Sequence, residues 1–264
     1  MVTLKINYPS YSLKRNYSFT ALIPIEQNPM TKEITAPEDG GFKTLYLLHG
    51  FGGDCNDWIL NTRIFSYAEE HKIAIIMPSG ENSFYLDNSY SEERYSNYVS
   101  KELIEITRAL FPLSDKREDT SIGGLSMGGF GAICNGLHNP GVFGSIIAMS
   151  SALITEKVAA MTPEYSDFMA GYPYYEYIFG KPEKVLKSQA DPKYLAEQLA
   201  KSGEAIPNIY LACGREDFTL EANRSFEQHL TRLGIEHTYV EDDGNHDWNF
   251  WDKYIQKALE WLSR

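Results

Sequence analysis

The chain has 264 residues, and its content of 43% hydrophobic and 13% aromatic residues is sufficient for a large core. No interior linker, repeat or low-complexity tract divides it, so we expect one domain over 1–264. The net charge of −12 argues against nucleic acid and against an anionic membrane as partners, because both are bound by basic surfaces.

The sequence shows no sign of export, membrane insertion or metal binding. Its first residues lack the charged-then-apolar layout of a signal peptide, and no apolar run approaches the ~18 residues that a membrane span needs. The three cysteines lie far apart, without a Cys-x-x-Cys or Cys/His cluster. We therefore expect a cytoplasmic protein with reduced thiols and no metal site.

Predicted strands and helices alternate along most of the chain. Two strands of alternating apolar and polar residues, 2–8 and 17–24, are expected to pair antiparallel at one sheet edge, and a loop over 28–42 follows. The other expected strands are 44–48, 73–78, 122–125, 143–149, 208–213 and 236–241. The expected helices are 58–71, 98–110, 127–137, 220–233 and 248–262. This alternation predicts an α/β fold, with a mostly parallel sheet covered by helices on both faces.

One stretch combines a strand end, a tight turn and a helix start around a serine. The segment Gly124–Gly128 is a Gly-x-Ser-x-Gly pattern, which in this context is typical of a nucleophile elbow. The glycines allow the backbone to turn tightly. The turn places the Ser126 hydroxyl at a helix N-terminus, where developing negative charge is favoured. We therefore predict that Ser126 is a catalytic nucleophile.

A second glycine-rich segment, 49–54, follows the strand expected at 44–48 and reads His-Gly-Phe-Gly-Gly-Asp. Acyl transfer produces an oxyanion, which needs preorganised N–H donors. With a nucleophile elbow, one donor is the amide after the nucleophile, here Met127, and the other comes from a loop after an earlier strand. We expect the second donor to be the Phe51 amide.

A serine hydroxyl needs a base to take its proton, and histidine suits that task near neutral pH. Of the six histidines, only His246 follows the last predicted strand, in a turn rich in Gly, Asn and Asp. An orienting carboxylate is expected between the serine and the histidine in chain order. Asp217, which follows the strand at 208–213, is the favoured carboxylate, and its neighbour Glu216 remains the alternative.

The least regular part of the sequence is 151–206, which is expected to form a partly helical, cap-like insertion over the sheet. This segment and a loop at 81–97 both follow strand ends, at the edge where ligands of open α/β sheets bind. Both are rich in aromatic residues, which can wall a substrate pocket or pack the interface of a homo-oligomer. The residues predicted to line the pocket are Tyr85, Tyr172, Tyr175 and Phe179.

Four ordered motifs together resemble the esterase D superfamily, and within it the small bacterial tributyrin esterases most closely. They are Leu47-Leu48-His49-Gly50, Gly124-Leu125-Ser126-Met127-Gly128-Gly129, Cys213-Gly214-Arg215-Glu216-Asp217-Phe218, and His246-Asp247-Trp248 with Trp251. The resemblance implies a single α/β-hydrolase domain, hydrolysis of short-chain esters and no cofactor. It equates Ser126, Asp217 and His246 with the catalytic triad, and the Phe51 and Met127 amides with the oxyanion hole.

We therefore expect a serine carboxylesterase that hydrolyses tributyrin-type or acetyl esters, small-molecule substrates, through an acyl-enzyme. Relatives of similar fold leave alternatives open. S-formylglutathione hydrolases carry a Cys closer to the oxyanion glycine than Cys55 is to Gly50, and acetylated or feruloylated carbohydrates are further substrates in the superfamily. A catalytically silent binding protein with the same fold is the hypothesis from another class.

Overall fold

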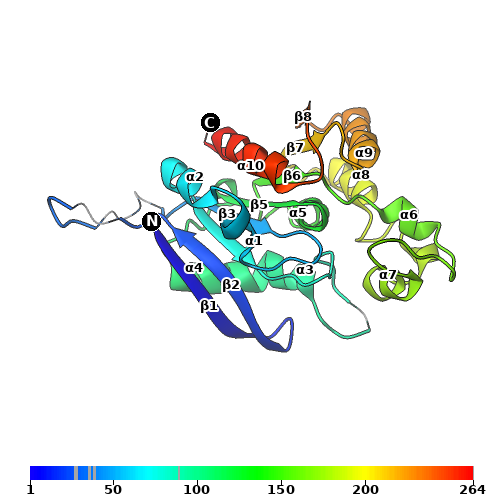
Figure 1. The fold of residues 1–264 in the computed structure, drawn as a ribbon, viewed down its shortest axis with the longest axis horizontal. Coiled ribbons are helices and arrows are strands. Elements are labelled where there is room, and N and C mark those ends of the chain that lie inside the picture. Colours follow the sequence, from blue (N-terminus) through cyan, green and yellow to red (C-terminus); the bar gives the residue numbers. More distant parts are fainter. Residues whose placement is uncertain (27–28, 35–36, 38–39, 89, 264) are drawn as a thin grey trace.

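A single sheet runs through the middle of the molecule (Figure 1). Its strands are β1 (Val2–Ser10), β2 (Arg15–Ile23), β3 (Thr44–Leu48), β4 (Ala74–Pro78), β5 (Thr120–Leu125), β6 (Ser145–Met149), β7 (Asn208–Gly214) and β8 (Thr238–Asp242). The computed structural model describes residues 1–26, 29–34, 37, 40–88 and 90–263, and within them the eight strands follow the order β1-β2-β4-β3-β5-β6-β7-β8. β2 pairs antiparallel with β1 and with β4, and the other neighbours are parallel. The predicted antiparallel pair at the edge of a mostly parallel sheet is thus confirmed.

The burial of each strand follows its position in the sheet. β1 lies at the edge, and its side chains mostly alternate between exposed and half-buried. Every side chain of β3, β4, β5 and β6 is buried. These inner strands meet helices on both faces, so each position needs an apolar or small residue. This requirement explains why they appear in the sequence as nearly continuous apolar runs.

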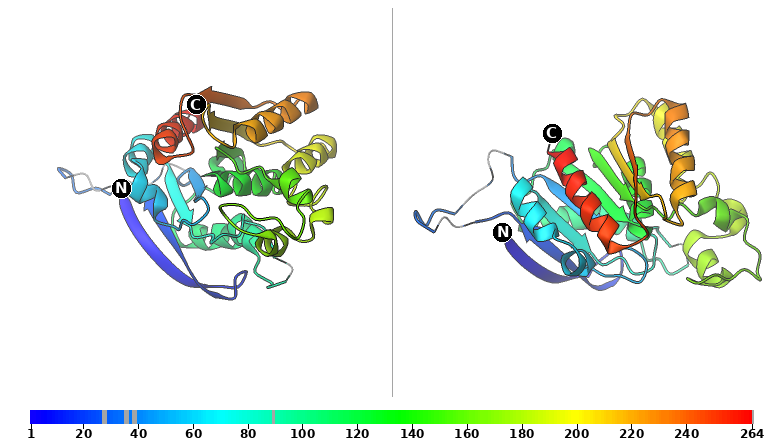
Figure 2. Two further views of the ribbon diagram at one scale, coloured as in Figure 1. Left: turned by 45° about the vertical axis from the view of Figure 1, so that its right-hand side comes forward. Right: turned by 45° about the horizontal axis from the view of Figure 1, so that its top comes forward.

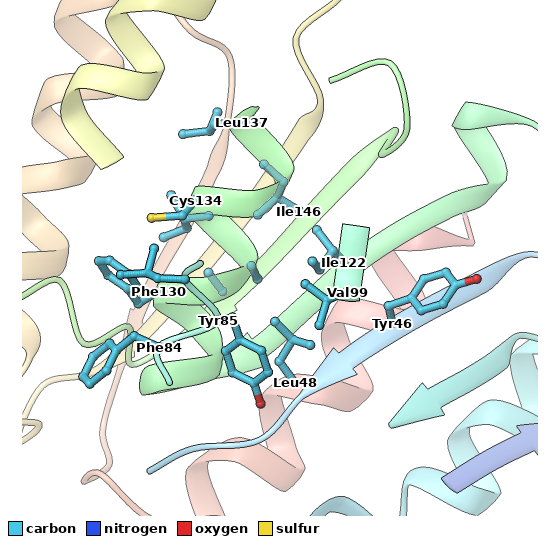
Figure 3. Packing of buried hydrophobic residues seen from close by; sticks show 14 of the residues in the cluster. Tyr46, Leu48, Phe84, Tyr85, Val99, Ile122, Phe130, Cys134, Leu137 and Ile146 are labelled. Carbon is cyan, nitrogen blue, oxygen red and sulfur yellow. The ribbon is translucent and has the colours of Figure 1, made fainter. Parts of the chain in front are cut away.

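Helices cover both faces of the sheet (Figure 2). The described α-helices are α1 (Asp57–Asn61), α2 (Ile64–His71), α3 (Tyr95–Asn97), α4 (Leu103–Leu110), α5 (Met127–His138), α6 (Thr155–Ala159), α7 (Tyr172–Phe179), α8 (Pro192–Ser202), α9 (Leu220–Leu233) and α10 (Trp248–Leu262). On one face α2 and α10 pack together and, with α1, enclose a hydrophobic cluster. On the other face α4, α5, α8 and α9 enclose a larger cluster, and Figure 3 shows its part around α5.

Two predicted helices are interrupted, and two strands begin two residues later than expected. The helix expected over 58–71 is divided into α1 and α2, because Thr62 is extended and its hydroxyl accepts the Ile64 N–H at 3.2 Å. A side chain that takes over backbone hydrogen bonds competes with the helix in this way. The helix expected over 98–110 begins with a π-helical turn, Tyr98–Glu102. β6 and β8 start at 145 and 238 rather than at 143 and 236.

The expected insertion, 151–206, contains α6, α7, α8 and a short 3₁₀ helix, Pro182–Lys184. α6 and α7 lie beyond one end of the sheet (Figure 1), whereas α8 packs against α5 and α9. The expected loops 28–42 and 81–97 fall partly outside the described residues, at 28, 35–36, 38–39 and 89. No helix in the described part of the chain has the length and apolar character required to cross a membrane.

Candidate active site

Ser126 lies in the turn between β5 and α5. Its φ of 53° and ψ of −117° are backbone angles that residues other than glycine rarely adopt. The glycines of the turn are required by close contacts. A Cβ on Gly124 would lie 2.5 Å from the backbone of Gly128, and a Cβ on Gly128 would lie 2.5 Å from the Leu48 carbonyl oxygen. The strand, tight turn and helix predicted around this serine are all present.

Two loops at the same edge of the sheet bring a histidine and a carboxylate to Ser126. His246 follows β8, and its Nε2 lies 2.9 Å from Ser126 Oγ. Asp217 follows β7, and its Oδ1 and Oδ2 lie 3.0 and 2.9 Å from His246 Nδ1. The Asp217 side chain is fully buried, and that of His246 is 17% exposed. The three predicted residues are therefore joined by hydrogen bonds in the order Ser126, His246, Asp217.

The alternative carboxylate, Glu216, has a different partner. Its Oε2 accepts a hydrogen bond from the Gly244 N–H at 2.7 Å, and its own N–H donates to the Gly244 carbonyl oxygen at 3.1 Å. A Cβ on Gly214 would lie 2.1 Å from the same carbonyl oxygen, so the turns after β7 and β8 pack directly on each other. Glu216 thus holds the turn that carries His246 and forms no hydrogen bond with the imidazole.

Several donors hold Asp217 as a carboxylate. Its Oδ1 accepts hydrogen bonds from the Thr219 N–H at 2.8 Å and from the Thr219 hydroxyl at 2.7 Å. Burial acts to raise the pKa of Asp217, but hydrogen bonds from His246, Ser150 and Thr219 outweigh burial and lower this pKa below its usual value. An ionised carboxylate only accepts, so His246 Nδ1 carries a proton and Nε2 is free to accept from the Ser126 hydroxyl.

Ser150 connects Asp217 to α10, although the sequence patterns do not single it out. It is fully buried at the end of β6, with a φ of 47°. Its hydroxyl accepts a hydrogen bond from Trp251 Nε1–H at 3.1 Å and donates one to Asp217. The Trp251 ring also meets the His246 ring edge-on, with centroids 4.9 Å apart. The one sequence signal for Ser150 is its place after the strand next to the elbow strand.

The glycine-rich segment 49–53 lies against the elbow, where a Cβ on Gly50 would lie 2.7 Å from the Leu125 side chain. His49 supports this segment, because its Nε2 accepts the Gly80 N–H and its Nδ1–H donates to the Gly50 carbonyl oxygen, both at 2.7 Å. Burial lowers the pKa of His49, which favours the neutral ring that this pattern requires.

Among the described residues, the two amides predicted to form the oxyanion hole have no hydrogen-bond acceptor. Phe51 N–H has no backbone acceptor among the described residues. Met127 is the first residue of α5, so its N–H has no acceptor within the helix. In the described part of the chain, both N–H groups are thus left without an acceptor.

Ser126 and His246 line a cleft of about 240 Å³, whose other walls are mainly apolar and aromatic. The lining residues are Gly50, Phe51, Asp57, Leu125, Ser126, Phe168, Met169, Phe218, His246, Trp248 and Trp251. Phe168 and Phe218 are exposed and meet edge-on with ring centroids 6.0 Å apart, and the Phe218 ring lies 4.4 Å from that of His246. The described residues contain no group of three or more His, Cys, Asp or Glu side chains placed to hold a metal ion.

None of the four aromatic residues predicted to line the pocket lines this cleft, which corrects that prediction. Tyr85 is buried in the core (Figure 3), where its hydroxyl donates to the His49 carbonyl oxygen and its ring fills the space beside Gly131. Phe179 packs against Phe84 in the same core. Tyr172 donates to Glu176 of its own helix at 3.3 Å. The number of aromatic residues in a segment does not indicate which of their rings packing will cover.

Tyr175 is linked to the cleft through Asp167. Its hydroxyl lies 3.0 Å from both carboxylate oxygens of Asp167, which also accepts the Met169 N–H at 2.9 Å. Desolvation acts to raise the pKa of Asp167, but its hydrogen bonds and the Lys157 ammonium hold this pKa well below the usual range. From the insertion 151–206, the residues that reach the cleft are Phe168 and Met169, on a turn held by Asp167.

Comparison with known proteins places the chain among esterases. The family model described as "Putative esterase" matches residues 24–262. An acetyl esterase of Caldicellulosiruptor saccharolyticus is 44% identical over 264 residues, which cover 100% of this chain and 99% of that protein.

Two solved structures from Staphylococcus aureus match the whole chain. The fluorophosphonate-binding serine hydrolase F has a TM-score of 0.87 and 29% identity, over 100% of this chain and 98% of that one. An S-formylglutathione hydrolase has a TM-score of 0.84 and 30% identity, over 100% and 99% of the two chains. These matches confirm the predicted α/β-hydrolase fold and the resemblance to the esterase D superfamily. The chain therefore belongs to the family described as "Putative esterase", and it is a carboxylic ester hydrolase of the serine type.

Proposed function

We propose that this protein hydrolyses short-chain acyl esters, of the acetyl or tributyrin type, through an acyl-enzyme on Ser126. The observation that carries the proposal is the hydrogen-bonded order Ser126, His246, Asp217 at a cleft. The 44% identity to an acetyl esterase supports the acyl group. The cleft volume of about 240 Å³ lies below the ~300–1,000 Å³ typical of sites for drug-sized ligands, which favours a small acyl chain.

In the proposed acylation, Ser126 Oγ attacks the ester carbonyl carbon while its proton passes to His246 Nε2, 2.9 Å away. The carbonyl oxygen becomes an oxyanion and accepts hydrogen bonds from the Phe51 and Met127 amides. Asp217 keeps His246 Nδ1 protonated and stabilises the imidazolium that forms. Collapse of the intermediate breaks the bond to the alcohol, which leaves with the proton from Nε2.

Deacylation repeats these steps with water as the nucleophile. His246 Nε2 takes a proton from the water while the water oxygen attacks the acyl carbon, and the same two amides hold the second oxyanion. When this intermediate collapses, the bond to Ser126 breaks and Oγ regains its proton from Nε2. The products are the carboxylic acid and the free enzyme.

Hydrolysis of S-formylglutathione is the second candidate function. It is favoured by the 30% identity to the S-formylglutathione hydrolase of Staphylococcus aureus over the whole chain. Acetylated and feruloylated carbohydrates remain further candidate substrates. The three classes differ in the leaving group, which is a simple alcohol, a thiol peptide or a sugar, so product analysis separates them.

The proposal is tested with p-nitrophenyl esters of acetate, butyrate and octanoate, run beside S-formylglutathione and acetylated and feruloylated sugars. We expect acetate and butyrate esters to be cleaved faster than octanoate. Treatment with a fluorophosphonate should label Ser126, which mass spectrometry of the peptide that contains it would detect. Ser126→Ala should abolish both labelling and hydrolysis. Labelling at Ser150 or Ser151, or hydrolysis by the variant, contradicts the assignment.

A further inference from the structure

The cleft beside Ser126 contains one acidic side chain that the proposed mechanism does not use. Of the residues that line the cleft, Asp57 and His246 alone are ionisable, and neither Lys nor Arg is among them. Most of the remaining wall is apolar or aromatic and includes the Trp248 ring. An ester bound at Ser126 therefore meets a carboxylate in largely apolar surroundings.

The Asp57 carboxylate has few partners within the protein. It is half-buried, and burial raises the pKa of Asp57 although the Asp54 backbone amide donates to it. No side chain in the described part of the chain donates a hydrogen bond to it or forms an ion pair with it. A carboxylate can accept about four hydrogen bonds, so Asp57 keeps acceptor capacity for a ligand.

Packing, rather than ion pairing, holds Asp57 beside the cleft. Its neighbour Trp58 anchors α1, because Trp58 Nε1–H donates to the Leu48 carbonyl oxygen at 3.0 Å and its ring meets Trp248 edge-on at 5.4 Å. A Cβ on Gly53 would lie 2.0 Å from Asp57 Oδ2, so glycine leaves room for the carboxylate. With five residues, α1 has only a small dipole, so an acid at its start stabilises this helix little.

We propose that Asp57 and Trp248 form a subsite beside Ser126 that binds a positively charged or hydroxyl-bearing group of the ester and disfavours an anionic group. This inference rests on the proposed esterase function and specifies the chemistry of its substrate. A half-buried carboxylate attracts a cation or a hydrogen-bond donor and repels an anion. An indole face attracts a cation through its quadrupole. Glutathione carries two carboxylates against one ammonium group, so its net negative charge makes its thioesters poorer substrates for this subsite.

The test uses acetylcholine and 3,3-dimethylbutyl acetate, two acetyl esters of nearly the same shape that differ in charge. For the wild type we expect kcat/KM to be about two- to fivefold higher for acetylcholine, the effect of one partly exposed ion pair. In Asp57→Asn this preference should disappear. The matched control is Asp54→Asn, which removes the same charge from an exposed residue outside the cleft lining and should keep the wild-type ratio.

Glycerol monoacetate and propyl acetate show whether a hydroxyl is the group that the subsite favours. Asparagine still accepts a hydrogen bond from a hydroxyl, whereas leucine does not. A preference for the glycerol ester that survives in Asp57→Asn and is lost in Asp57→Leu assigns the subsite to hydroxyl groups. Equal ratios for the wild type and both variants, in both pairs of esters, overturn the proposal.

Hydrolysis of p-nitrophenyl acetate by the same preparations reports on the esterase function alone. Activity on this ester with unchanged ratios refutes the subsite and leaves the esterase function standing. A wild type without esterase activity refutes both. If the Asp57 variants do not fold, the wild type alone decides, by its kcat/KM for the anionic ester acetoxyacetate and for the neutral ester propyl acetate. Equal values for these two esters overturn the subsite.

Discussion

Replacing Asp217 by asparagine should inactivate the enzyme, because four hydrogen-bond donors point at this carboxylate. They are His246 Nδ1–H, the Thr219 amide, the Thr219 hydroxyl and the Ser150 hydroxyl. An asparagine side chain has one acceptor oxygen and an NH₂ group that only donates. If the oxygen stays beside Thr219, the NH₂ group faces His246 Nδ1–H across the present 2.9 Å. The amide oxygen also lies 3.0 Å from Nδ1, but it already accepts from both Thr219 donors, so the NH₂ group at 2.9 Å favours the tautomer with the proton on Nε2. In that tautomer Nε2 can no longer accept the proton of Ser126.

The flipped amide gives no better arrangement, because its NH₂ group would face the Thr219 N–H across 2.8 Å, donor against donor. We therefore expect kcat/KM for p-nitrophenyl acetate to fall on the order of 10⁴-fold, as when a triad histidine is held in the wrong tautomer. Circular dichroism and thermal unfolding check that the variant remains folded.

The matched control for this experiment is Glu216→Gln. Glutamine can still accept the Gly244 N–H through its side-chain oxygen, so the turn that carries His246 should persist and most activity should remain. An Asp217→Asn variant with near-wild-type activity would refute the reasoning. An inactive Glu216→Gln with an active Asp217→Asn would exchange the two roles.

Four other outcomes can be measured with p-nitrophenyl esters and with urea unfolding. Ser126→Ala should remain folded and lose on the order of 10³-fold or more in kcat/KM, and normal turnover would exclude the proposed nucleophile. Ser150→Ala should lower the free energy of unfolding by about 1–3 kcal/mol, because a buried indole N–H loses its acceptor; an unchanged urea midpoint would contradict this. The pKa of Asp217 is lowered in the folded state, so its ionised form stabilises the protein above the unfolded pKa of about 3.9. The difference in free energy of unfolding between wild type and Asp217→Asn should therefore shrink as pH falls through the folded pKa of Asp217. A difference that stays constant with pH argues against this stabilisation by the ionised carboxylate. Phe168→Ala should change the ratio of acetate to octanoate hydrolysis, and Tyr172→Ala should leave this ratio unchanged. The reverse result would support the pocket residues that were predicted from the sequence.

Local chemistry made the strand-turn-helix around Ser126 predictable. The turn needs glycine at 124 and 128 because the backbones of adjacent elements approach to contact distance there. Five consecutive residues, Gly124–Gly128, therefore suffice to predict it. The inner strands were equally predictable from the sequence, since burial on both faces excludes polar residues from most of their positions. The chain order of serine, acid and histidine then indicated His246 and favoured Asp217, because the carboxyl ends of parallel strands meet at one edge of the sheet. Chain order left Glu216 open as the alternative, since it is the neighbour of Asp217.

Sequence alone predicted most of the strands and helices, a mostly parallel sheet with an antiparallel pair at one edge, and the three residues that meet at one end of that sheet. The order of the strands came from the structure. Tertiary structure alone decided which side chains surround them. Ser126 and His246 are 120 residues apart, and the rings near them come from separate segments. Whether an aromatic ring lines a cleft or fills a core depends on the space its neighbours leave: Tyr85 is buried beside Gly131, whereas Phe168 is exposed on a turn. Asp57 and Ser150 were identified only from the structure. Their burial and hydrogen-bond partners depend on contacts between distant segments, which leave no periodic pattern in the sequence.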